Sequence, residues 1–156
     1  MRYRYILAFG SNLGNREANC QRGQVALALW GEFLRISQFL YTEPLQSEQF
    51  LVDPNQETFL NYIVEFHSPL SPHQLYEKIV LIEDEVGHDR CRKWAPRHLD
   101  IDILLVAEDE HGKNFGECTW LRLDPDQALQ IPHAELKGRP FLMQLLTEDF
   151  QLALDL

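Results

Sequence analysis

The segment from Ser71 to Gly87 restricts the fold most, because it contains a complete set of signals for one amphipathic helix. Ser71 is an N-cap residue, Pro72 occupies the first turn, and Gln74 stands three residues after the cap, as a capping box requires. Glycine then ends the pattern at position 87. The segment therefore predicts a helix whose buried face is formed by Leu75, Ile79, Ile82 and Val86. Glu83 lies one position from that face and, from spacing alone, would be an ordinary boundary carboxylate.

Strand and helix patterns alternate along the rest of the chain without a linker, a repeat or a low-complexity stretch. We expect strands over residues 3–9, 33–41, 58–66 and 119–123, a helix over 16–30, and two short helical pieces within 132–146. Residues 10–15 predict a tight turn, and because they lack both the GK[ST] ending and the GxGxxG spacing, Gly10 and Gly14 are assigned to the turn rather than to a ligand. The order is β-α-β repeated once, within one domain over residues 1–156.

Composition excludes several classes of function. With 45% hydrophobic and 24% charged residues, a 156-residue chain can bury a proper core. A formal net charge of −10 argues against a nucleic-acid backbone as the partner. No targeting segment is visible, and no stretch reaches the roughly 20 apolar residues of a membrane span. The scattered cysteines, Cys20, Cys91 and Cys118, favour reduced thiols over disulfides or zinc. We therefore expect a cytoplasmic monomer that binds small molecules.

Asp100 and Asp102 provide the clearest chemical signal. Residues two apart in a strand point to the same face, so the two carboxylates would project together, roughly 6.6 Å apart along the backbone. Ile101, Ile103 and Leu105 would then face the core on the other side. Magnesium prefers one or two carboxylates with water and substrate phosphates, so the pair could hold ions that bridge a nucleoside triphosphate. The alternative for these residues alone is two solvated acids on a half-buried strand.

A cationic cluster directly precedes the aspartates. It consists of Arg90, Arg92, Lys93 and Arg97, four of the fourteen Lys and Arg residues of an acidic chain. A nucleotide requires both signs of charge, carboxylates for its metal and cationic donors for its remaining phosphate oxygens. The whole segment from 90 to 102 therefore predicts a nucleotide site.

The sequence WAPRHLDIDIL at 94–104 resembles the signature of the 6-hydroxymethyl-7,8-dihydropterin pyrophosphokinase family, and the likeness extends from about Tyr5 to Thr147. Further segments typical of the family follow in order: AFGSNLGN at 8–15, YTEPL at 41–45, FLN at 59–61, IE at 82–83, IPH at 131–133 and RPF at 139–141. The resemblance implies a ferredoxin-like α+β fold with an antiparallel sheet, consistent with the order of elements. It also implies transfer of diphosphate from ATP to the pterin alcohol in folate biosynthesis.

The resemblance assigns site residues position by position. Two Mg²⁺ ions would be held by Asp100 and Asp102, which with Arg90 and Arg97 are the catalytic residues. The residues implied for ATP are Glu83, Arg90, Trp94, Arg97, Ile103, His133 and Arg139. Those implied for the pterin are Thr42, Leu45, Phe59, Asn61, Trp94 and Phe141.

Residue chemistry independently favours a pterin pocket. Phe59 and Asn61 share one face of a predicted strand and offer a ring for stacking beside an amide that can donate and accept, while Phe141 could supply an opposite ring. The alternative is that both aromatic residues belong to the core and that Asn61 satisfies a backbone group.

Some positions depart from the family pattern on the ATP side. His88, Ala128 and Gln130 replace residues that are Arg or Thr in many members, and Leu145 replaces a proline. These departures favour weaker nucleotide binding and keep open a non-catalytic pterin- or nucleotide-binding relative. A magnesium-dependent phosphotransferase with another acceptor is a further alternative, and the sequence does not assign roles to Arg92 and Lys93.

Overall fold

The computed structural model describes residues 2–43, 58–87, 98–123 and 129–153. The strands in these ranges are β1 (Tyr3–Ser11), β2 (Glu32–Ile36), β3 (Leu40–Thr42), β4 (Phe59–Ser68) and β5 (Asp100–Glu108). The helices are α1 (Arg16–Leu27), α2 (Pro72–Val86) and α3 (Pro140–Gln144), with 3-10 turns at Phe115–Glu117 and Leu136–Gly138 and a π-helical turn at Leu145–Asp149.

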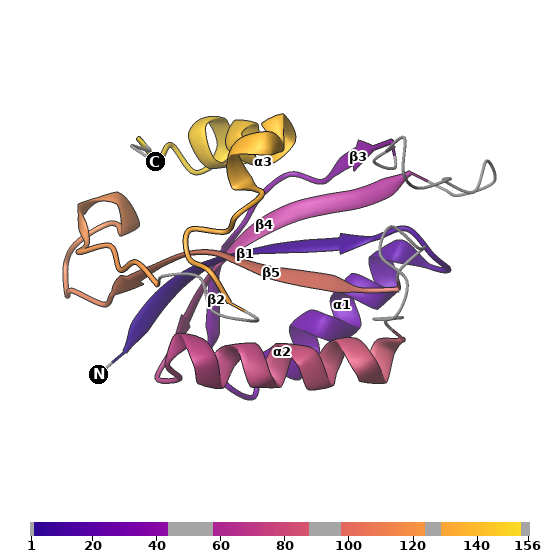
Figure 1. Ribbon diagram of the computed structural model, residues 1–156, viewed down its shortest axis with the longest axis horizontal. Coiled ribbons are helices and arrows are strands. Elements are labelled where there is room, and N and C mark those ends of the chain that lie inside the picture. Colours follow the sequence, from indigo (N-terminus) through magenta and orange to yellow (C-terminus); the bar gives the residue numbers. More distant parts are fainter. Residues whose placement is uncertain (1, 44–57, 88–97, 124–128, 154–156) are drawn as a thin grey trace.

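The described strands form one antiparallel sheet in the order β2-β4-β1-β5, with β3 also paired to β4. Helices α1 and α2 lie together against one face of the sheet, and α3 lies on the opposite face (Figure 1). This is the α+β fold that the sequence predicts, and the strand order is that of a ferredoxin-like β-α-β repeat. No helix in the described ranges is both long and apolar enough to span a bilayer.

The sheet separates two apolar cores. The core under α1 and α2 includes Phe9 and Tyr62, whose rings stack with centroids 5.3 Å apart, and the buried face of α2. The core under α3 includes Ile6, Ile63 and Leu142. Because both faces of the central strands are buried, the register of these strands is strongly fixed.

Helix α2 has the caps that the sequence predicts. The Ser71 side chain accepts from the Gln74 backbone N–H, and the Gln74 side chain accepts from the Ser71 N–H at 2.9 Å. Gly87 ends the helix with φ of 112°, in the left-handed region that glycine enters without steric cost. The predicted helix type and its bounds are therefore confirmed.

Four predicted segments differ from the structure. Strand β1 continues through Gly10 and Ser11, because its last residues pair with β4 and β5, and this pairing overrides the turn tendency of Gly-Ser. Helix α1 ends at Leu27 rather than at residue 30. The predicted strand over 33–41 is divided into β2 and β3, and the predicted strand over 119–123 makes only isolated bridges to residues 107 and 131.

A β-bulge in β5 reverses the direction of one predicted core residue. Ile6 pairs with Leu105 while Leu7 pairs with Ile103, so Leu104 is an extra residue in β5. Ile103 consequently faces the core under α1 and α2, but Leu105 faces the core under α3. The prediction that both lie on one face is wrong, because strict alternation does not hold across a bulge.

The described cysteines do not form a disulfide. Cys20 and Cys118 are both buried and free, whereas Cys91 lies outside the described residues. Burial raises the pKa of the Cys20 thiol to about 12. Cys20 is therefore a protonated core residue at neutral pH.

A buried ionic cluster joins the α3 face of the sheet to the C-terminal segment. Glu65 on β4 is 5% exposed and accepts from Arg35 on β2 at 2.8 Å, and its second oxygen lies 2.7 Å from His67 Nε2. The Arg35 guanidinium also donates to the Phe150 carbonyl and lies 4.2 Å from the Phe150 ring centroid. Burial alone would raise the pKa of Glu65, but the hydrogen bonds and charges of His67 and Arg35 outweigh it and lower the pKa.

We expect Glu65→Gln to destabilise the protein by about 1–3 kcal/mol at pH 7, because Arg35 loses its buried partner. Since the folded-state pKa of Glu65 is lowered, its contribution is fully present above the unfolded pKa of about 4.3 and is lost as the pH falls through the folded value. Urea unfolding at several pH values should therefore show a difference that shrinks below about pH 4.3. The exposed Glu32→Gln on β2 is the control, and a pH-independent difference for Glu65→Gln would contradict this explanation.

Candidate active site

Three neighbouring strands bring the predicted site residues into one row. Gly10 on β1 pairs with Asn61 of β4 on one side and with Asp100 of β5 on the other. Directly opposite residues of an antiparallel sheet point to the same face, so the Asn61 and Asp100 side chains lie on the same side of the sheet. Ala8, two residues earlier on β1, pairs with Asp102 and contributes to the core under α3. The aspartates therefore share the α3 face with Asn61, and both are partly exposed.

Two basic side chains lie beside Asp102. His133 Nε2 is 3.6 Å from Asp102 Oδ1, and Arg139 Nη1 is 3.8 Å from Oδ2. Burial of the imidazole would lower the pKa of His133, but the hydrogen-bonding and charge effects of Asp102 outweigh it, so the pKa is raised. Arg139 also forms an ion pair with Glu135. The site therefore places the Arg139 cation, and an imidazole that is cationic when protonated, next to Asp102, as phosphate binding beside a metal requires.

The β5 bulge explains how His133 reaches this position. The carbonyl of the extra residue, Leu104, accepts from the His133 backbone N–H at 3.1 Å. Leu104 follows Asp102 by two residues, so the bulge holds the segment containing His133 against the end of β5 that carries the aspartates. Sequence spacing alone does not reveal this contact, because bulges have no reliable sequence signature.

The carboxylate pair fits a magnesium ion by its donor chemistry. Asp100 and Asp102 offer hard oxygen ligands on one face, and Mg²⁺ is commonly held by one or two carboxylates with substrate phosphates and water. No cluster of three or more His, Cys, Asp or Glu residues able to hold a metal occurs in the part of the chain that the structure describes.

The Asn61 amide is oriented by its neighbours. Its Nδ2 group donates to Thr42 Oγ1 at 2.8 Å and to the Phe59 carbonyl at 3.2 Å. Because both amide hydrogens are used within the protein, Oδ1 is the atom that can accept from a ligand. In this orientation the amide can only accept a hydrogen bond from a ligand, and Thr42 helps to hold that orientation.

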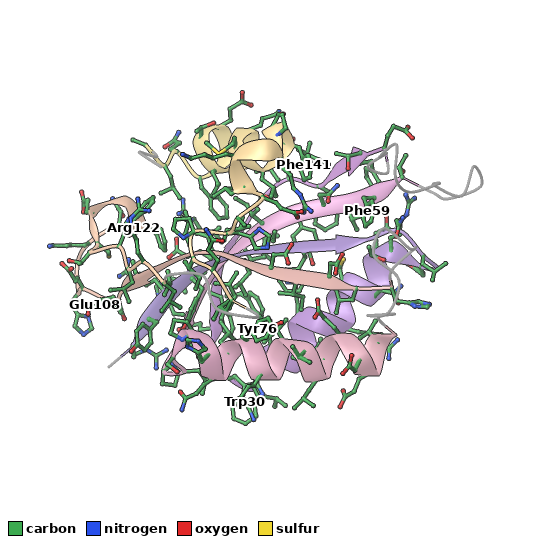
Figure 2. All side chains as sticks on the ribbon, in the orientation of Figure 1. Trp30, Phe59, Tyr76, Glu108, Arg122 and Phe141 are labelled. Atoms are coloured by element: carbon green, nitrogen blue, oxygen red, sulfur yellow. The ribbon has the colours of Figure 1, made fainter. Side chains whose placement is uncertain are left out.

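Two aromatic side chains lie on the same side of the sheet as this amide. Figure 2 shows Phe59 at the start of β4 and Phe141 on α3, on the same side of the sheet. Both are partly buried, and Phe141 packs against the core under α3. Both rings therefore lie on the side of the sheet that carries the row from Asn61 to Asp100.

Glu83 has a structural role that its spacing did not predict. The carboxylate is on α2, is 5% exposed, and accepts from the Ile101 backbone N–H at 2.9 Å. Ile101 separates the two aspartates, so Glu83 fixes β5 between them. The expectation of an ordinary boundary carboxylate is wrong, because the edge strand β5 needs an acceptor for this N–H in a buried position.

The remaining predicted residues fall into two groups. Ile103 is 3% exposed in the core under α1 and α2, so a contact from it to a nucleotide on the aspartate face would be made by its backbone. Leu45, Arg90, Trp94 and Arg97 lie outside the described residues, as do His88, Arg92, Lys93 and Ala128. Their assigned roles stay predictions.

Fold and site together define an α+β protein that carries paired carboxylates, neighbouring basic side chains, an oriented amide and two aromatic side chains on one side of its sheet. Paired carboxylates beside basic groups are typical of enzymes that act on phosphorylated substrates. The family model described as 7,8-dihydro-6-hydroxymethylpterin-pyrophosphokinase matches residues 6–149. The chain belongs to this family, as its sequence motifs predict.

Several similar proteins have names that are consistent with membership of this family. A 2-amino-4-hydroxy-6-hydroxymethyldihydropteridine pyrophosphokinase of Aquifex aeolicus is 31% identical over 142 residues, covering 91% of this chain and 77% of that protein. One of Pseudomonas aeruginosa is 31% identical over 145 residues, covering 93% and 79%. The folate synthesis bifunctional protein of Chlamydia trachomatis is 33% identical over 141 residues, covering 90% of this chain but only 29% of that protein. This chain therefore spans less than a third of the bifunctional relative.

We expect Glu83→Leu to lower the free energy of unfolding by about 1–3 kcal/mol, because the Ile101 N–H loses its buried acceptor. Hydrogen exchange at the Ile101 amide should accelerate in the native state. Glu85→Leu, on the exposed side of α2, is the matched control and should change stability by less than about 0.5 kcal/mol. Unchanged protection of Ile101 in Glu83→Leu would show that this hydrogen bond does not hold β5.

Proposed function

We propose that this chain transfers diphosphate from ATP to the hydroxymethyl group of 6-hydroxymethyl-7,8-dihydropterin, releasing AMP and the pterin diphosphate for folate biosynthesis. The observation that supports this proposal best is the row formed by Asn61, Gly10 and Asp100, in which only a glycine stands between the Asn61 amide and the first of the two aspartates. Family membership supports the same reaction. We expect the reaction to take place in the cytoplasm, in a monomer.

The pterin is assigned to the side of the row nearer β4. A pterin is flat and has N–H donors along one edge, which Asn61 Oδ1 can accept while its Nδ2 group is held by Thr42. Phe59 and Phe141 would stack on the two faces of the ring. Leu45 and Trp94, both outside the described residues, are assigned to the same pocket.

ATP is assigned to the side of the row nearer β5. Mg²⁺ held by Asp100 and Asp102 would neutralise charge on the triphosphate when bound. His133 and Arg139 lie next to Asp102 and would bind phosphate oxygens, with Arg139 exchanging Glu135 for the nucleotide. Arg90 and Arg97 are assigned to the same phosphates.

In the proposed step, the pterin alcohol oxygen attacks the β-phosphorus of ATP in line with the oxygen that links it to the α-phosphate. A bond forms from the alcohol oxygen to the β-phosphorus, the bond to the α-phosphate oxygen breaks, AMP leaves with that electron pair, and the hydroxyl proton is released. Positioning and electrostatic stabilisation account for most catalysis in such transfers. The preorganised row on β4, β1 and β5 supplies the positioning.

Incubation with ATP, Mg²⁺ and the pterin alcohol, followed by chromatography, should give AMP and pterin diphosphate in equal amounts. Asp100→Asn and Asp102→Asn should each reduce the rate at least 100-fold, because electrostatic stabilisation by such groups is worth several kcal/mol. Asp84→Asn on the exposed side of α2 is the charge-matched control. A folded protein that binds pterin but forms no AMP would be a non-catalytic relative, and turnover of a non-pterin alcohol would identify another phosphotransferase.

Thr42→Val should weaken pterin binding about five- to tenfold, because the amide of Asn61 loses the acceptor that orients it, a hydrogen bond worth about 1 kcal/mol. Fluorescence titration with the pterin measures this change, with the exposed Thr147→Val as the control. Equal pterin affinities for Thr42→Val and the parent protein would show that Thr42 does not contribute to pterin binding.

A further inference from the structure

Gly10 occupies the centre of the row that contains Asn61 and Asp100. It lies inside β1 and pairs with both of these residues, so the position of its absent side chain is between them on the α3 face. The preceding residue on this face is Ala8, which is also small. Strand β1 therefore presents almost no side chain between the proposed pterin and metal positions.

The backbone at Gly10 does not require glycine. The glycines with positive φ are Gly14, Gly87 and Gly112, and Gly10 is not among them. Glycine inside a strand weakens the strand and often marks a site where a ligand or another backbone approaches closely.

Packing within the described residues does not require glycine either. A Cβ atom at Gly10 would lie 3.6 Å from Asn61 Oδ1, 3.6 Å from the Leu60 carbonyl and 3.9 Å from Phe59 Cδ1, which are ordinary van der Waals distances. At Gly31, by contrast, a Cβ atom would lie only 2.3 Å from the His67 carbonyl, so glycine is needed there for packing. The part of the protein that the structure describes therefore accommodates a methyl group at position 10.

The added methyl group would approach the atom that is assigned to the pterin. Its nearest side-chain neighbour is Asn61 Oδ1, the acceptor left open when Thr42 and the Phe59 carbonyl take the amide hydrogens. Its next side-chain neighbour is the Phe59 ring. A methyl group here would therefore occupy space beside both contacts of the proposed pocket.

We propose that Gly10 is a specificity-determining residue of the acceptor site. Its missing side chain leaves the floor of the site open between Asn61 and Asp100, so that a flat bicyclic substrate can bond to Asn61 Oδ1 while its alcohol reaches the carboxylate pair. This inference rests on the proposed function, because it takes the flat acceptor to be the pterin. The inference adds Gly10 to the residues of the acceptor site, although the sequence pattern assigned this glycine only to a turn.

Gly10→Ala tests the proposal, with Gly116→Ala as the matched control. A Cβ atom at Gly116 would meet Leu152 at 3.6 Å, a similar fit at a position on the 3-10 turn Phe115–Glu117, outside the proposed site. We expect Gly10→Ala to melt no lower than the parent protein and to bind the pterin alcohol at least tenfold more weakly by fluorescence titration. Binding of a non-transferable ATP analogue with Mg²⁺ should change less than twofold, and Gly116→Ala should bind both ligands normally.

A measurement on the unsubstituted protein keeps the test independent of folding. With ¹⁵N-glycine labelling, saturating pterin should shift the Gly10 amide signal and leave that of Gly116 in place. Normal pterin affinity in Gly10→Ala, or a loss confined to the ATP analogue, would overturn the role of Gly10 while leaving the proposed function intact. Absence of pterin binding by the parent protein would overturn both.

Discussion

The site depends on the register in which β1 pairs with β4 on one side and with β5 on the other. This pairing sets Asn61, Gly10 and Asp100 in one row, although the three residues are separated by up to 90 positions in the chain. A shift of one residue in either pairing would turn the side chains of that strand to the opposite face. The buried cores on both faces of the sheet oppose such a shift, so the same apolar packing that stabilises the fold also fixes the site.

Strand β5 is an edge strand, and two local contacts hold it in place. Glu83 bonds the Ile101 N–H between the aspartates, and the bulge at Leu104 directs a carbonyl to the His133 backbone. The first contact comes from α2 and the second from the segment that leads to α3. Segments from both sides of the sheet therefore contact β5 at or next to the carboxylate pair. Preorganisation of this kind is what transfer by positioning requires.

Much of this arrangement could be predicted from the sequence, because local patterns report local physics. The caps of α2, the common face of Asp100 and Asp102, and the short helices after residue 132 follow from spacing and residue chemistry. The side of the sheet to which Leu105 points could not be predicted in this way, because the bulge arises from pairing with β1. The burial of Glu83 and the place of Gly10 inside β1 were also missed, since each depends on a strand distant in sequence. The GSN sequence alone indicated a turn, and only pairing with neighbouring strands extends β1 through Gly10 and Ser11.

The central claim is that the acceptor pocket and the carboxylate pair adjoin on one face of the sheet. Relaxation of the hydroxymethyl protons of bound pterin, measured by NMR with Mn²⁺ in place of Mg²⁺ and a non-transferable ATP analogue present, tests it most directly. The account predicts strong paramagnetic broadening of these protons that disappears when Asp100 and Asp102 are both replaced by asparagine. Pterin that binds fully yet shows no broadening by Mn²⁺ in the unsubstituted protein would contradict it.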